Sequence, residues 1–162
     1  MKRTLLIALA LAFLVPGMAK AQASAAGSVT LNVNQILSIQ ITANSDVTFN
    51  PTEAEFDVGL IDGESATLRT KGNTPHEILV SADVATFGYT GSAATPPAKP
   101  STDFQWKVGA GTYVGMTLAP AQVGTFARGV HDTTVDYQLL LDYVKDPEGT
   151  YDLAYTYQVL PN

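Results

Sequence analysis

Apolar and polar residues alternate with a period of two along much of this chain, as they do in half-buried β-strands. The pattern is clearest near the C-terminus, where two alternating segments flank the turn-rich sequence Lys145–Gly149. Their apolar faces consist of Val135, Tyr137, Leu139, Leu141 and Tyr143, and of Tyr151, Leu153, Tyr155, Tyr157 and Val159. Because Pro and Gly favour tight reversals, the sequence predicts a β-hairpin from about residue 133 to residue 160.

Shorter alternating segments predict strands over most of the remaining chain. They lie at 29–41, 46–50, 64–71, 77–84 and 104–108, with one or two short strands inside 112–130. The first segment is either one bent strand or two strands that join near residues 34–35. No helical pattern of convincing length accompanies them. The sequence therefore predicts an all-β fold, an Ig-like antiparallel β-sandwich of about seven to nine strands.

The first 21 residues have a different pattern. Lys2 and Arg3 precede an unbroken apolar run from Leu5 to Val15, and the small-x-small triplet Ala19-Lys20-Ala21 follows. This order is typical of a secretory signal peptide, and the run is shorter than the roughly 20 residues that span a bilayer. We expect cleavage after Ala21, which leaves residues 22–162 as one exported domain without a transmembrane anchor. Its location would be periplasmic, cell-surface or extracellular.

Residues 88–103 interrupt the alternation. Three prolines and several small residues offer almost nothing to bury, and proline cannot donate to a β-ladder. A linker between two domains would leave two cysteine-free halves that are marginal in size for independent folding. The sequence therefore predicts a long, exposed, Pro-rich loop within a single domain.

Charge and cysteine content limit the classes of partner. Three of the nine Lys and Arg residues lie in the first 21 positions and all fifteen Asp and Glu residues lie beyond them, so residues 22–162 carry a formal net charge of −9. A surface of this sign repels nucleic acid, so no nucleic-acid partner is expected. The absence of cysteine excludes disulfides and thiolate chemistry.

Few residues of the chain are candidates for catalysis or metal binding. No nucleophile elbow, zinc-protease or phosphate-loop motif occurs, and the sequence predicts that the protein is not an enzyme and needs no cofactor. The two histidines, His76 and His131, lie beside predicted turns and are expected to be exposed. Weak calcium ligands are offered by an acidic cluster, Glu53, Glu55, Asp57, Asp62 and Glu64, although its spacing is not that of a known calcium loop.

Aromatic residues give the remaining candidates for ligand binding. Tyr89 and Tyr113 border Gly-rich segments and would suit stacking against a sugar. Trp106 alternates with Phe104 and Val108, which favours a place in the core.

Two ends of the chain carry a resemblance to a known family. An alternating segment (Val29 to Ile41) follows the predicted signal peptide closely, and Gly149-Thr150-Tyr151 opens a last strand from Asp152 to Val159. This layout resembles bacterial exported β-sandwich domains of the pilin-like and spore-coat-U type. The resemblance implies a surface or extracellular structural subunit, and in some of these families one subunit donates its N-terminal strand to a neighbour. The chain departs from the spore-coat-U pattern in having no cysteines.

Two functions follow as hypotheses. The first is an exported structural or adhesive surface protein that associates with itself or with other surface proteins. Val29, Leu31 and Val33 would be the side chains inserted into a neighbour, although most strands pair within their own domain. The second is a secreted module that binds carbohydrate or calcium through the tyrosines or the acidic cluster.

Overall fold

The computed structural model describes residues 28–162, so the predicted signal peptide lies outside the described residues. Residues 28–33, taken by themselves, contain no helix or strand. The rest is almost entirely β-structure, which confirms the predicted fold class. The elements are β1 (Leu37–Ala43), α1 (Glu53–Val58), β2 (Leu60–Gly72), β3 (His76–Ala82), β4 (Gly88–Gly91), the 3-10 turn η1 (Ser101–Asp103), β5 (Phe104–Val108), β6 (Val114–Gly115), β7 (Ala121–Phe126), β8 (Gly129–Leu140), β9 (Gly149–Asp152) and β10 (Tyr155–Pro161).

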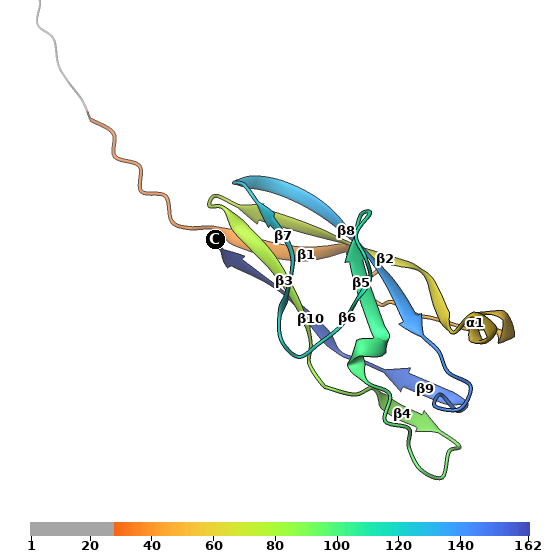
Figure 1. The fold of residues 1–162 in the computed structure, drawn as a ribbon. Coiled ribbons are helices and arrows are strands. Elements are labelled where there is room, and N and C mark those ends of the chain that lie inside the picture. Colours follow the sequence, from red (N-terminus) through yellow and green to blue (C-terminus); the bar gives the residue numbers. More distant parts are fainter. Residues whose placement is uncertain (1–27) are drawn as a thin grey trace, which may run out of the picture. The chain divides into compact units, whose positions relative to one another are not determined.

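The strands form two principal antiparallel sheets and one small ribbon (Figure 1). One sheet has the order β1-β2-β8-β5-β6, the second has the order β10-β3-β7, and β4 pairs with β9. Consecutive strands often belong to different sheets: the chain passes from one sheet to the other between β2 and β3 and again between β7 and β8. Most paired strands are therefore far apart in the sequence.

The core lies between the two principal sheets. It is built from Ala66, Leu68, Ile78, Val80, Ala82, Phe104, Trp106, Met116, Val123, Val135 and Tyr137. Because side chains alternate across a strand, those on β2, β3, β5 and β8 occupy every second position, while Val123 comes from β7 and Met116 directly follows β6. The expected core position of Trp106 is confirmed, and burial of this apolar set is the main stabilising term.

The predicted C-terminal hairpin is wrong. β8 pairs with β2 and β5 in one sheet, whereas β10 pairs with β3 in the other. The last alternating segment is also divided, because β9 ends at Asp152 and β10 begins at Tyr155. Alternation shows that a segment is half-buried but does not identify its partner, so two strong strands joined by a short connection can still belong to different sheets.

Other boundaries differ from those expected. The strand predicted at 29–41 begins only at Leu37, and 46–50 is not a strand, although Val47 and Phe49 pack against the core. A short helix, α1, occupies part of the acidic segment, and its capping box forms between Thr52 and Glu55. The predicted loop at 88–103 starts with strand β4 and ends with η1. No helix in residues 28–162 is long and apolar enough to cross a bilayer.

Candidate functional site: two neighbouring sheet edges

The edge strands of the two principal sheets lie side by side at β1 and β10 (Figure 1). Among the described strands, β1 pairs only with β2, and β10 pairs only with β3. Each therefore has one backbone edge that is not hydrogen-bonded in a ladder to another described strand. Such an edge presents free N–H and C=O groups to which a further strand can be added.

The inward faces of these two strands are apolar but incompletely covered. Every second residue points inward on each strand and is half-buried, namely Leu37, Ile39 and Ile41 on β1 and Tyr155, Tyr157 and Val159 on β10. On the neighbouring strands β2 and β3, by contrast, Leu68 and Ile78 are fully buried. We call these six half-buried side chains the edge groove. Apolar area remains there that an added segment would remove from water.

Tyrosine hydroxyls connect the edge groove to the core. The hydroxyls of Tyr137 on β8 and Tyr157 on β10 lie 2.6 Å apart, and that of Tyr155 donates to Tyr137 at 3.4 Å. Burial is the main cause that raises the pKa of all three phenols. All three hydroxyls therefore stay protonated at neutral pH and form a neutral hydrogen-bonded cluster beneath β10.

The three predicted assembly residues belong to the segment before β1. Val29, Leu31 and Val33 are 97%, 81% and 64% exposed, and their backbone is not in a strand. The strand expected from residue 29 is therefore absent at these positions. They retain the alternation of a strand without the pairing of one.

The acidic cluster is spread over separate elements. Glu53, Glu55 and Asp57 lie on α1, whereas Asp62 and Glu64 lie on β2. Glu55 caps its own helix, and the hydrogen bonds from Thr52 lower its pKa. Within residues 28–162, no group of three or more His, Asp and Glu side chains could hold a metal ion. The structure thus offers no built calcium site in the part of the chain that it describes.

The two tyrosines expected to stack on a ligand are engaged within the protein. The hydroxyl of Tyr89 on β4 donates to the carbonyl oxygen of Glu148 at 2.6 Å, and its ring lies 5.1 Å from that of Tyr151 on β9. Tyr113 is half-buried and lies beneath the ammonium of Lys107, 4.5 Å from the ring centroid. These contacts secure the β4–β9 ribbon and the end of β5, and they do not form a stacking platform.

The expectation that both histidines are exposed is also wrong. His76 is fully buried at the start of β3, and His131 is half-buried on β8. The His76 Nδ1–H donates to the carbonyl oxygen of Thr74 at 3.1 Å, and Nε2 shares a 3.0 Å hydrogen bond with the hydroxyl of Thr70. Both ring nitrogens are therefore used in holding the β2–β3 turn.

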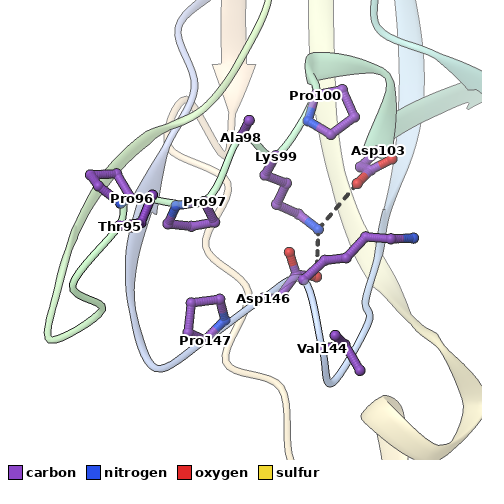
Figure 2. A pocket seen from close by; sticks show the side chains of 11 residues that line it. Thr95, Pro96, Pro97, Ala98, Lys99, Pro100, Asp103, Val144, Asp146 and Pro147 are labelled. Carbon is purple, nitrogen blue, oxygen red and sulfur yellow. Dashed lines mark hydrogen bonds and ion pairs between the residues drawn. The ribbon is translucent and has the colours of Figure 1, made fainter.

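A pocket that the sequence did not indicate lies beside the Pro-rich loop (Figure 2). It has a volume of about 350 Å³ and is lined by residues 95–100, Asp103 and residues 144–147. Lys99 projects into it, with its side chain only 3% exposed. The ammonium lies 2.7 Å from Asp146 Oδ2, 2.7 Å from the carbonyl oxygen of Leu140 and 3.3 Å from Asp103 Oδ2. The loop expected to be exposed is thus anchored through a buried ion pair.

Comparison with known proteins adds little. No family model and no curated protein matches the chain. Among solved structures, it is similar to a chain from the structure of a chaperone-usher pilus, with a TM-score of 0.49 and 12% identity. That match covers 89% of this chain and 100% of the other. A likeness at this level carries no conclusion about the family or the function of this chain.

Proposed function

We propose that this chain is an exported, non-enzymatic structural subunit that associates with further copies of itself. The observation that supports it best is the edge groove, where two sheet edges meet and leave an apolar face half-covered. In the proposed assembly, residues 29–33 of one copy add to this edge in another copy. Backbone hydrogen bonds would supply affinity, and alternate side chains would enter the groove.

The chemistry of the segment suits this role. Val29, Leu31 and Val33 share one face of an extended chain, while Thr30 and Asn32 share the other. The apolar face matches the aliphatic and aromatic side chains of the edge groove, and the polar face would remain toward water. Burial of the apolar face on docking removes from water side chains that are now largely exposed.

The second hypothesis receives no support of this kind. Tyr89 and Tyr113 are occupied by contacts within the protein, and the acidic side chains do not converge in the described residues. We therefore propose neither a glycan nor a calcium ligand.

Leu31→Asp tests the proposal. Burying a leucine side chain contributes about 1.5–3 kcal/mol, and burying an unpaired carboxylate costs more than that gain, so association should weaken by at least about a hundredfold. Size-exclusion chromatography and negative-stain electron microscopy of the purified chain would measure the loss of oligomers. Circular dichroism should remain that of the folded monomer, because Leu31 is 81% exposed.

Asn32→Asp is the matched control. It adds the same charge one residue away, on the face that would remain in water, and it should preserve the oligomers. Equal loss in both variants would indicate a general charge effect. Unchanged oligomers in Leu31→Asp, or a wild-type chain that stays monomeric at high concentration, would contradict strand addition by this segment.

A further inference from the structure

The pocket beside the Pro-rich loop combines groups that are rarely buried together. Lys99 and Asp146 have side chains only 3% and 5% exposed, and their charged atoms are 2.7 Å apart. A second carboxylate, that of Asp103, is 28% exposed and lies 3.3 Å from the same nitrogen. Figure 2 shows the lysine pointing between the two carboxylates. A nucleophile, an electrophile and a proton carrier are thus held in one site.

We propose that Lys99 and Asp146 become joined by a covalent amide bond, an intramolecular isopeptide cross-link. In this step the Nζ of the neutral lysine attacks the Cγ of the protonated Asp146 side chain. An N–C bond forms, a C–O bond breaks, and one water is released. The reaction is a condensation, so it needs no oxidant, reductant or activated co-reactant. Its only products are the amide and the water.

Burial supplies the first requirement of this reaction. The attacking amine and the attacked acid must both be neutral, whereas in water both groups are charged. Burial excludes bulk water from the pair, and the 2.7 Å contact gives the proton a direct path from Lys99 Nζ to Asp146 Oδ2. Contact over a hydrogen-bond distance supplies the second requirement, because reacting groups held together act at a very high effective concentration.

Asp103 supplies the third requirement. Its carboxylate contacts the attacking nitrogen, so it can accept the proton that nitrogen loses on attack and return it to the oxygen that leaves as water. The carboxylate is regenerated at the end and is therefore catalytic. The adjoining pocket gives the released water a way out.

The remaining contacts hold the reacting groups in place. The carbonyl oxygen of Leu140 accepts a hydrogen bond from the Lys99 ammonium at 2.7 Å. The backbone N–H of Asp142 donates to Asp146 Oδ2 at 3.0 Å, which fixes the orientation of the carboxyl group beside the lysine. The cross-link would join positions that are 47 residues apart and would tie the Pro-rich loop permanently to the β8–β9 connection.

The chain contains a matched negative control. Lys145 and Asp142 form an ion pair of almost the same length, 2.9 Å, in the same connection. Their side chains are 80% and 39% exposed, so water stabilises both charges. Proximity alone would cross-link this pair as well, whereas the proposed mechanism leaves it unreacted.

Mass spectrometry of the denatured, purified full chain gives the test. We expect an intact mass lower by one water than the mass of the same polypeptide with all side chains free. Trypsin should then release a branched peptide that joins residues 72–107 to residues 146–162. A linear mass and two separate peptides, from protein that is folded by circular dichroism, would overturn the proposal.

Two variants separate the roles of the residues. Lys99→Arg keeps the positive charge but lacks the nucleophilic amine, and it should show the full linear mass. Asp103→Asn should fold but cross-link more slowly by at least tenfold, followed as the linear fraction over time after refolding. Lys145→Arg should retain the mass loss. If Lys99→Arg fails to fold, the wild-type intact mass and branched peptide still decide the question.

Discussion

Tyr137→Phe removes a single buried oxygen at the point where β8 meets the edge strand β10. Tyr137 is fully buried, and its hydroxyl shares a 2.6 Å hydrogen bond with that of Tyr157. The substitution leaves the ring in place against Phe104, 5.1 Å away between centroids, so it creates almost no cavity. It does leave the hydroxyls of Tyr157 and Tyr155 without the partner that both share. A buried polar group without a partner costs about 1–3 kcal/mol, which is the expected loss in the free energy of unfolding at neutral pH.

A double-mutant cycle isolates the hydrogen bond. Tyr157→Phe alone leaves the Tyr137 hydroxyl with only the 3.4 Å contact from Tyr155, so it should also destabilise the protein. When both hydroxyls are absent, neither is left unsatisfied. The double variant should therefore lose less than the sum of the single losses, by about 1 kcal/mol, measured by urea unfolding. Additive losses would show that the two hydroxyls are not coupled.

The same tyrosine gives a prediction for alkaline pH. Burial raises the pKa of Tyr137 above its ordinary value of 10.0, whereas in the unfolded chain the phenol ionises near that value. Above pH 10, the unfolded state therefore binds fewer protons than the folded state, and stability falls as pH rises. Below that pH the contribution is fully present. Each tyrosine held neutral gives a slope of about −1.4 kcal/mol per pH unit.

Urea unfolding of wild type and Tyr137→Phe above pH 10 measures this slope. The variant lacks one such phenol, so its free energy of unfolding should fall less steeply, by about 1.4 kcal/mol per pH unit. All other ionisable side chains are the same in both proteins, so their contributions cancel in the comparison. Equal slopes would mean that Tyr137 ionises in the folded state as readily as in the unfolded chain, and would refute its sequestration from water.

Two further predictions concern the core and the small ribbon. Leu68→Ala removes a fully buried side chain from β2 and should lower the free energy of unfolding by about 2–5 kcal/mol, measured by thermal or urea unfolding. Arg69→Ala, the control, breaks only a half-exposed ion pair with Asp132 and should cost less than about 1 kcal/mol. Similar losses in the two variants would contradict this placement of the core. Gly91→Ala places a Cβ against the Tyr89 ring and should separate β4 from β9. Hydrogen exchange should then accelerate at 88–91 but not in β2 or β8, and unchanged protection at 88–91 would show that the ring can move aside.

The sequence predicted individual strands better than it predicted their pairing. The segments at 64–71, 77–84 and 104–108 correspond to β2, β3 and β5, because alternation records which side chains face the core. It does not record backbone hydrogen bonds. Val47 and Phe49 alternate and pack against the core without belonging to a strand, so the pattern predicted their burial correctly and their secondary structure wrongly.

His76 and Lys99 are both buried against expectation, but only the burial of His76 could have been predicted from the sequence. His76 has the same parity as Ile78 and Val80, so its position on the inward face of β3 was available from the pattern, and only its closeness to a turn suggested exposure. Lys99 offered no such signal. It lies among prolines, and the partner that makes its burial tolerable, Asp146, is 47 residues away. A buried pair of opposite charges becomes visible only when the chain has folded.

Residues 29–33, before β1, have the apolar and polar alternation of a strand but do not form one. Val29, Leu31 and Val33 have the periodicity of Ile39 and Ile41, yet only the latter pair lies in a strand and packs against the core. Local propensity therefore does not distinguish the two segments, and strand formation depends on whether an edge is available. β1 already occupies the free edge of β2, and the edge groove has no described strand beside it. A segment with the alternation of a strand, in a chain whose apolar edge strands each pair with one described strand alone, is the arrangement that association between copies would satisfy.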